Sequence, residues 1–453
     1  MRRLSVMTGE RRFPTAASTQ TPDFHGQGDE AFVQQDLSNG LSVLVQEAHA
    51  APVASFWIWY RVGSRNEHVG LTGISHWVEH MLFKGTSAFP KGSAEKAIAR
   101  EGGMFNGATS YDFTTFFATL PADRIELSLR IEADRMQNAS FDHKEVEAER
   151  TVIISERQGA ENSPEFLLNE EVMSAALRVH PYGDPTVGHM CDLRAITRQQ
   201  LYDHYKTYYV PNNALVVAVG DFDAQAMLGA IEARFGEVPR GPDVPPVTAV
   251  EPPQRGERRV IVRREGYVPY LRVACHAPPV RDSDFFALAV LNAILTGASA
   301  MTFMGGGLSN KSCRLYQALV GEELAVDVSG LLLPSVDPFP YILSVVARPD
   351  RQPEEVEEAL EQELTRVMND SVTQEEVDKA IKQAQAQFAY SSESVTGHAL
   401  WLGFSEIFAD HTWADRYLET LGAVTVEDVQ RAAERVLAPS RRTVGWYVPT
   451  NSE

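Results

Sequence analysis

The sequence predicts an α+β fold in two parts of similar size. Short β-rich runs and helical stretches do not alternate strictly, which is typical of helices packed on one face of a mixed or antiparallel sheet. A chain of 453 residues is long enough for two or three domains with large cores. Between residues 237 and 257, six prolines interrupt a polar stretch that can continue neither a helix nor a central strand. We therefore expect an extension over 1–30, a domain over 31–236, a linker over 237–257 and a second domain over 258–453.

In the first part, runs rich in β-branched and aromatic residues predict strands, and stretches with apolar residues at helical spacing predict helices. The expected strands span 41–45, 55–62, 113–120 and 214–219. The expected helices span 71–84, 92–101, 121–137, 143–160 and 223–235.

The same signals continue in the second part. The expected strands span 259–263, 271–276, 341–346 and 443–447. The expected helices span 282–295, 312–321, 352–368, 374–408 and 425–437. Thr373 and Glu376 have the spacing of a capping box, which marks the start of the helix expected over 374–408.

Residues 76–80 form a pattern that favours a catalytic zinc site, because they read His76-Trp77-Val78-Glu79-His80. On a helix, positions i and i+4 share one face, so both imidazoles can reach one ion. Glu79 can point to the same side without being a ligand, where a general base would stand. This order, His-x-x-Glu-His, is the inverted form of the common helical zinc motif, found in the inverzincins. The alternative is a solvated helix face that happens to hold two histidines.

A catalytic zinc site needs a third protein ligand, and the segment 141–161 offers the best candidates. Its strong helix formers and apolar spacing predict a helix. Glu149 and Glu156 are seven residues apart and share one face of that helix. One carboxylate could bind the metal while the other holds a ligand or a substrate group. The alternative is a charged solvent face, which most glutamate-rich helices have.

The stretch HWVEHMLFKGT, residues 76–86, resembles the signature of the M16 peptidase family, which includes pitrilysin, insulin-degrading enzyme and the mitochondrial processing peptidase. The chain is most similar to the short-chain, zinc-bearing subunits of that family. This resemblance implies that His76, His80 and Glu156 bind one Zn²⁺ per chain. It also implies that Glu79 activates the attacking water and that Glu149 is the family's second, non-ligating glutamate.

Other stretches are similar to the same family. In the first part they are 102–106 with Thr109 and Asp112, then His180-Pro181-Tyr182-Gly183, then 213–221. In the second part they are Gly305-Gly306-Gly307-Leu308-Ser309 and Arg314-Leu315-Tyr316. The match covers most of residues 38–225 and is looser in the second half.

The resemblance implies two homologous domains of the α/β-sandwich type that together form half of a clam-shell chamber. A second M16-type subunit would close the chamber. The family's peptide substrates add as a β-strand at the edge formed by residues 102–109, where main-chain hydrogen bonds give affinity. The residues implied in substrate binding are Asn106, Gly107, Ala108, Thr109 and Arg314. The alternative for Asn106 is an ordinary turn residue between glycines.

The second half departs from the family pattern at one position. Family members that supply an arginine and a tyrosine for substrate binding carry Leu-Ala-Tyr about a dozen residues after the arginine. Here Arg314 is present, but Leu324-Ala325 is followed by Val326. We therefore expect a heterodimer in which a sibling chain supplies the Arg/Tyr pair, with a homodimer as the alternative.

These observations favour a zinc-dependent endopeptidase that hydrolyses unfolded peptides or oligopeptides in a chamber formed with a second subunit. Two alternatives from other classes remain. One is a non-catalytic structural subunit of the same family, and the other is a peptide-binding clamp in which the metal is only structural.

Charge and composition limit the remaining possibilities. A formal net charge of −20 argues against nucleic acid as a partner, and no apolar run is long enough to span a bilayer. Cys191, Cys275 and Cys313 are odd in number and far apart, so no disulfide framework is expected. The first twenty residues hold four arginines and one acid, as in organelle transit peptides, but no secretory signal. We expect a cytoplasmic protein rather than a periplasmic or mitochondrial one.

Overall fold

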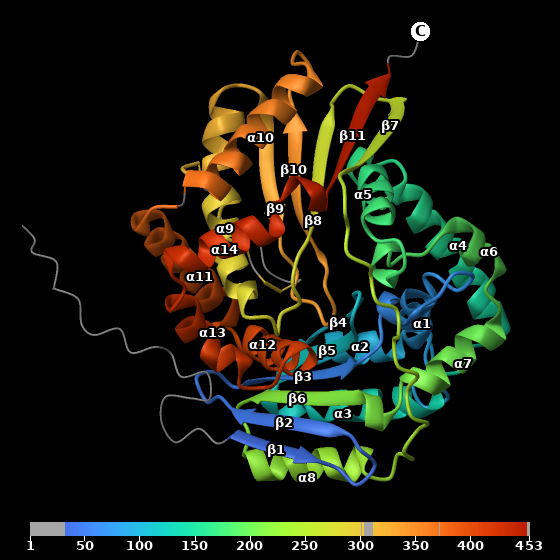
Figure 1. Cartoon of the computed structure of the whole chain (residues 1–453). Helices are drawn as coiled ribbons and strands as arrows, with labels where there is room; N and C mark the ends of the chain where they lie inside the picture. The colour runs from blue at the N-terminus through green and yellow to red at the C-terminus, as the bar shows by residue number, and fades with distance from the viewer. Residues whose placement is uncertain (1–31, 300, 303–310, 371, 451–453) are drawn as a thin grey trace, which may run out of the picture.

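The computed structural model describes residues 32–450 except 300, 303–310 and 371, and it contains two sheets that lie at an angle to each other (Figure 1). The first sheet has six strands in the order β1-β2-β6-β3-β5-β4. Their bounds are β1 Phe32–Asp36, β2 Ser42–Glu47, β3 Val53–Tyr60, β4 Met104–Thr109, β5 Thr114–Pro121 and β6 Ala214–Gly220. The α+β prediction is confirmed, and β4 forms one edge of this sheet.

The second sheet repeats the first with one strand fewer. Its order is β7-β11-β8-β10-β9, with bounds β7 Arg258–Glu265, β8 Tyr270–His276, β9 Ala325–Leu331, β10 Pro340–Ala347 and β11 Arg442–Thr450. In both sheets the strand completed last in the sequence pairs parallel with one neighbour and antiparallel with the other. By this order, β9 is the counterpart of the edge strand β4.

The helices follow the strands in matching order in the two halves. In the first half they are α1 Ile74–Leu82, α2 Ser93–Arg100, α3 Glu126–Asn138, α4 His143–Ala160, α5 Pro164–Ala176, α6 Met190–Ala195, α7 Arg198–Tyr208 and α8 Ala224–Phe235. In the second they are α9 Asp284–Thr296, the short η5 Tyr316–Gly321, α10 Pro353–Asp370, α11 Gln374–Ser392, α12 Val395–Phe408, α13 Trp413–Gly422 and α14 Val426–Val436. Within the described residues, each helix is too short or too polar to cross a bilayer.

The two halves exchange one helix each, which is visible in Figure 1. Helix α12 belongs to the second half but packs on β3 and β6, whereas α5 belongs to the first half but packs on β8 and β11. A Cβ atom at Gly403 of α12 would lie 2.2 Å from the indole nitrogen of Trp59. A Cβ atom at Gly445 of β11 would lie 2.2 Å from Val172 of α5. Both contacts therefore need a glycine, because no side chain fits between helix and sheet.

This exchange explains why the central strands of the first sheet are apolar on both faces. The strand β3 reads VASFWIWY, and all its residues after the first are buried. Phe56 and Ile58 point into a core shared with α1, α3 and α8, while Trp57 and Trp59 point into a core shared with the second half. Strands buried on two faces lose the simple alternation of apolar and polar residues.

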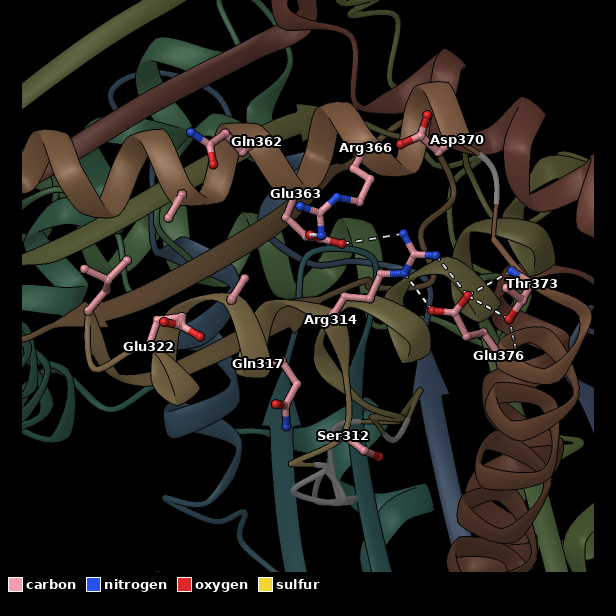
Figure 2. Close-up of a pocket in the computed structure, with 13 residues that line it drawn as sticks. Ser312, Arg314, Gln317, Glu322, Gln362, Glu363, Arg366, Asp370, Thr373 and Glu376 are labelled. Atoms are coloured by element: carbon pink, nitrogen blue, oxygen red, sulfur yellow. Dashed lines mark hydrogen bonds and ion pairs between the residues drawn. The ribbon is translucent and has the colours of Figure 1, made fainter.

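An arginine ties the helices of the second half together (Figure 2). The guanidinium of Arg314 donates from Nε and Nη2 to the two carboxylate oxygens of Glu376 on α11, at 2.7 and 2.9 Å. Its Nη1 lies 3.5 Å from Glu363 on α10. Glu376 also accepts from Thr373, as the capping box predicted from the sequence requires.

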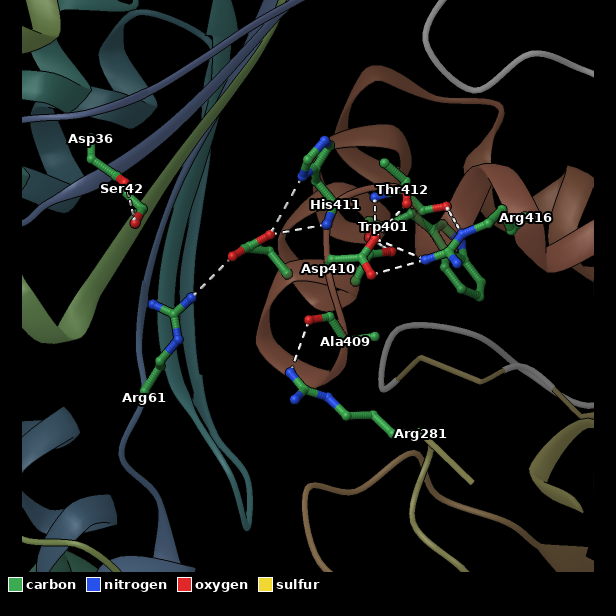
Figure 3. Close-up of polar contacts among 12 residues, drawn as sticks. Asp36, Ser42, Arg61, Arg281, Trp401, Ala409, Asp410, His411, Thr412 and Arg416 are labelled. Atoms are coloured by element: carbon green, nitrogen blue, oxygen red, sulfur yellow. Dashed lines mark hydrogen bonds and ion pairs between the residues drawn. The ribbon is translucent and has the colours of Figure 1, made fainter. Parts of the chain in front are cut away.

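The carboxyl end of α12 is held by residues from both halves (Figure 3). Arg281 donates to the carbonyl oxygens of Phe408 and Ala409, both at 2.9 Å, so it satisfies orphan carbonyls at the helix end. Arg61, which directly follows β3, pairs with Glu406 at 3.4 Å. These contacts fix the exchanged helix against the first sheet.

A partly buried polar network also joins the halves. Tyr182 donates to Asp112 at 2.6 Å, and Arg65 donates to Asp337 of the β9–β10 connection at 2.6 Å. His180 lies 3.1 Å from the same Asp337 carboxylate. Asp112, His180 and Tyr182 belong to stretches that resemble the M16 family, and here they connect the zinc-motif half to the other half.

Some expected elements differ from the structure. The single helix expected over 374–408 is wrong, since Ser394 caps a new helix by accepting from the N–H of Gly397. Helices α5, α6, α7 and α13 and strands β1, β4 and β9 were not among the expected elements. The predicted extension over 1–30 and the glycine run Gly305–Ser309 lie outside the described residues.

Candidate metal centre

The zinc motif lies on helix α1, which the fold holds at its start. Gly73 precedes the helix with a φ of 84°, and a Cβ atom there would lie 2.5 Å from the carbonyl oxygen of Val187. The buried carboxylate of Glu67 accepts the N–H groups of Gly73 and Ser75 at 2.7 and 2.8 Å. This carboxylate accepts from backbone N–H groups that have no partner within the helix. A negative charge at the start of a helix also interacts favourably with the helix dipole.

The remaining residues of α1 decide which way the histidines point. Trp77, Val78 and Met81 are fully buried against the core of the first sheet. Because a helix repeats every 3.6 residues, His76 and His80 are left on the opposite, partly exposed face. The sequence-predicted placement of both imidazoles on one face is found in the structure.

Helix α4 lies beside α1 and brings in the two glutamates. Asp142 caps α4 by accepting from the N–H groups of Lys144 and Glu145. The guanidinium of Arg150 lies 4.6 Å from the ring of Trp77, so it joins the two helices through a cation–π contact. The role of Arg150 was not predicted from the sequence, although Arg150 directly follows Glu149 in the expected helix.

Three side chains converge at the surface of this helix pair. Nε2 of His76 and Nε2 of His80 are 3.1 Å apart, and Oε2 of Glu156 lies 3.9 and 3.7 Å from them. Within the described parts of the chain, this is the group of three candidate ligand residues whose atoms lie within 4.8 Å of one another. The spacing predicted from the sequence therefore brings the three proposed ligands together.

These separations fit a zinc ion. A circle through three points at these distances has a radius of about 2.1 Å, which matches zinc bonds to imidazole nitrogen and carboxylate oxygen. Two imidazoles and one carboxylate are also a donor set of known catalytic zinc sites, in which a fourth position stays open. The residues present thus fit the metal.

Glu149 lies outside this group of three and holds His80. Its Oε1 atom lies 2.8 Å from Nδ1 of His80, and its other oxygen pairs with Lys84. A hydrogen bond from Nδ1–H to this carboxylate leaves Nε2 of His80 with a free lone pair toward the cluster. Lys84 was part of the matched signature, but its role beside Glu149 was not predicted.

The electrostatics of the two histidines differ. Burial and the neighbouring His80 lower the pKa of His76 to about 4, so its imidazole is neutral at physiological pH. Burial would lower the pKa of His80 too, but the hydrogen bond to Glu149 and the nearby carboxylates outweigh it and raise that pKa. The pKa of Glu149 is held low despite burial, because His80 and Lys84 stabilise its charge.

Glu79 lies between the two histidines and faces the edge strand. Its Oε2 atom accepts a hydrogen bond of 2.6 Å from the hydroxyl of Thr109 on β4. Burial raises the pKa of Glu79, and the hydrogen bond from Thr109 opposes that rise. A carboxylate whose pKa is raised is suited to accept a proton.

We expect Glu149→Gln to weaken zinc binding by about 10–100-fold, the usual cost of losing a partner that orients a metal-binding histidine. The glutamine keeps an acceptor for His80 but loses the negative charge that Lys84 neutralises. Zinc affinity measured by competition with a chelator tests this. Glu145→Gln, at a partly exposed position of the same helix where it pairs with Lys91, is the control, and equal affinity in both variants would contradict the role of Glu149.

We expect Thr109→Val to lower kcat/KM at neutral pH by about tenfold, because a hydrogen bond to a charged group is lost. Without the hydroxyl the pKa of Glu79 rises further, so the acidic limb of the pH profile should move to higher pH. Thr109→Ser keeps the hydroxyl and should behave like the wild type. An unchanged limb in Thr109→Val would show that Thr109 does not act on Glu79.

The other substrate-binding residues predicted in the first half lie on β4, directly beside α1. Asn106 is part of the strand rather than a turn, and its side chain accepts from the N–H of Gly107 at 2.9 Å. A Cβ atom at Gly107 would lie 2.8 Å from the ring of Phe116, so a larger residue does not fit. Ala108 and Thr109 complete the strand, whose outer edge is unpaired within the described residues.

The structure does not bring Arg314 to this cluster. It lies in the second half, where it lines a groove of about 920 Å³ between η5 and α10 (Figure 2). Val326 is on the edge strand β9 and 61% exposed. Substrate binding by Arg314 therefore stays a prediction, and within this chain it would have to act on a different site from the zinc cluster.

The counterpart of α1 in the second half lacks the pair of histidines. Helix α9 follows β8 as α1 follows β3, and it reads DFFALAVLNAILT, without histidine or cysteine. Almost the whole helix is buried. The fold therefore repeats, but the zinc motif does not.

Comparisons with known proteins agree with this arrangement. Residues 42–189 match the family model described as insulinase (peptidase family M16), and residues 195–384 match the model described as peptidase M16 inactive domain. The zinc protease PqqE of Helicobacter pylori is 28% identical over 91% of this chain and 92% of its own length. A probable mitochondrial-processing peptidase subunit beta of Arabidopsis thaliana is 26% identical over 64% of this chain and 55% of its own.

Two solved structures show how far the fold is shared. The crystal structure of a protease from Helicobacter pylori has a TM-score of 0.87 and 25% identity, and the match covers 92% of this chain and 99% of that one. The periplasmic protease PqqL from Escherichia coli has a TM-score of 0.71 and 20% identity, a likeness of fold alone. That match covers 92% of this chain but 48% of PqqL.

Proposed function

Since the chain belongs to peptidase family M16, whose two models cover residues 42–189 and 195–384, we propose that it is a zinc-dependent endopeptidase acting on unfolded peptides. The observation that carries the proposal is the convergence of His76, His80 and Glu156 with Glu79 beside them. Zinc proteases among the relatives support the metal.

The residues of the chain have separate roles in the proposed reaction. His76, His80 and Glu156 would hold the zinc ion, and Glu149 would hold His80 in the metal-binding tautomer. A zinc ion at this place supplies positive charge that polarises the scissile carbonyl and acidifies a water molecule. Glu79 would take a proton from that water and give it to the leaving amine. The edge strand β4 would align the peptide backbone through main-chain hydrogen bonds.

We propose that the domains divide at the proline-rich segment, into 31–236 and 258–453 with a linker over 237–257. The strands of the first sheet end at Gly220, and β7 begins at Arg258. Residues 239–256 form neither helix nor strand. Glu251 in this segment accepts N–H groups of residues 178–180, so the linker is anchored to the first half.

We also propose that a second M16-type subunit completes the chamber and supplies the Arg/Tyr pair. This chain corresponds to about half of PqqL, and one relative is named as a subunit. Val326 stands where the family tyrosine is expected, and Arg314 is engaged by Glu376 and Glu363. A homodimer is the competing assembly.

For the compartment, the cytoplasm stays our proposal. Cys191, Cys275 and Cys313 are all free thiols, which suits a reducing environment. Fractionation of the source cells with an antibody against this chain would test it.

The function is tested by cleavage of an internally quenched peptide by the purified chain, with and without a chelator. Chelator-sensitive cleavage by the chain alone supports a self-sufficient peptidase and argues against the heterodimer. Zinc bound in stoichiometric amount, with cleavage only after an extract of the source cells is added, supports a partner chain. Absence of cleavage in both cases refutes the enzyme and favours a peptide-binding or structural subunit.

The assembly is tested separately by light scattering and by co-purification from the source cells. A mass of two identical chains, with full activity, would refute the heterodimer. A second M16-type chain that co-purifies in equal amount, and restores cleavage when added back, would support it.

A further inference from the structure

Arg135 of α3 is buried next to the edge strand, with 3% of its surface exposed. A buried guanidinium is stable only where other groups compensate for the lost water. Its ion-pair partner is Glu132, one turn earlier and 1% exposed, with 3.5 Å between Nη1 and Oε1. Neither carboxylate oxygen of Glu132 has a hydrogen-bond partner among the described residues. The ion pair alone therefore does not account for the burial of this charge.

Three phenylalanine rings surround the guanidinium. Its central carbon lies 4.4 Å from the ring of Phe116 and 5.0 Å from the rings of Phe83 and Phe105. The ring of Phe83 contacts the other two edge-on, with centroids 5.5 Å apart in each case. Cation–π contacts are strongest where water is excluded, so this enclosed charge attracts all three rings.

The three rings come from the parts of the molecule that must be aligned for peptide cleavage. Phe83 directly follows helix α1, three residues after His80. Phe105 lies on β4 directly before Asn106, and Phe116 lies on β5. One charge thus contacts both the helix of the zinc motif and the strand at which a peptide would add.

The second half contains a matched pair without this environment. Helix α10 follows β10 as α3 follows β5, and Glu363 and Arg366 have the same spacing as Glu132 and Arg135. Arg366 donates to Glu363 at 2.7 Å, but its side chain is 60% exposed. Aromatic rings around the guanidinium are therefore particular to the half that carries the zinc motif, as far as the described residues show.

We propose that Arg135 is a positioning residue that fixes β4 relative to α1, so that a peptide added to β4 presents its backbone to the metal ligands. This inference rests on the proposed peptidase function. Arg135 acts through Phe105 and Phe83 and has no direct contact with substrate.

The test compares Arg135→Met, Arg135→Lys and the control Arg130→Met in the full chain, since Arg130 is an exposed arginine of the same helix. Methionine keeps the volume of the stem but removes the charge. For Arg135→Met with zinc bound, we expect KM for a quenched peptide to rise about tenfold, because the strand is no longer held. Arg135→Lys should recover part of the loss, and Arg130→Met should match the wild type.

A second readout does not depend on activity. In the metal-free chain, we expect amide hydrogens of Met104–Thr109 to exchange about tenfold faster in Arg135→Met than in the wild type, with other strands unchanged. Wild-type KM together with wild-type exchange on β4 would overturn the inference. Faster exchange throughout the metal-free chain, together with loss of zinc binding in the same variant, would overturn it too, since Arg135 would then only support folding. If the wild type cleaves no peptide, the proposed function fails, while exchange on β4 still decides the role of Arg135.

Discussion

Replacing Glu79 with glutamine is expected to lower kcat by about 10²–10⁴-fold, the usual contribution of a general base, while zinc binding stays unchanged. The amide has nearly the same shape and can still accept from Thr109, but it cannot take a proton from water. Turnover of a quenched peptide and zinc content of the same sample measure both effects.

The control for this prediction is Glu171→Gln, at an exposed glutamate of α5 away from the cluster. It should match the wild type in turnover and zinc content. Wild-type turnover in Glu79→Gln would remove Glu79 from the mechanism. Loss of zinc in this variant would mean that Glu79 contributes to the metal site directly.

His80→Ala is expected to lose the metal and, with it, all measurable cleavage. Zinc affinity should fall by more than about 100-fold, because even a residue that only orients a ligand is worth 10–100-fold. The substitution removes a ligand nitrogen and also leaves the buried Glu149 carboxylate without its histidine. Metal analysis after dialysis against a weak chelator measures the loss.

His143→Ala provides the matched control, because His143 is an exposed histidine at the start of α4. It should keep full zinc content and turnover. Circular dichroism of both variants should match the wild type, which would separate metal loss from unfolding. Stoichiometric zinc in His80→Ala would contradict the ligand assignment.

The parts of the metal centre that depend on local geometry could be predicted from the sequence. The placement of His76 and His80 on one face follows from the period of a single helix, and so does that of Glu149 and Glu156. Their convergence depends on how α1 and α4 pack, and no spacing in the sequence determines that packing. It became an expectation only through the resemblance to the M16 family.

Other features depend on contacts between residues far apart in the chain. The break between α11 and α12 follows from Ser394, but apolar helical spacing runs through it and suggested one helix. Helix α5 was missed because its apolar residues pack on the second sheet, whose first strand begins only at Arg258. The aromatic environment of Arg135 likewise brings together three elements that show no common pattern in the sequence.

The exchange of α5 and α12 has a consequence for any attempt to divide this protein. A cut within residues 239–256 would leave each fragment with a helix that covers the other fragment's sheet. The first fragment would expose Trp57 and Trp59 to water, and the second would expose the face of β8 and β11 that now contacts Val172. Neither fragment has a complete core on its own, because each sheet is covered by a helix of the other fragment. Co-expressed fragments should therefore reassemble by complementation. Each of the two homologous halves thus depends on the other to fold.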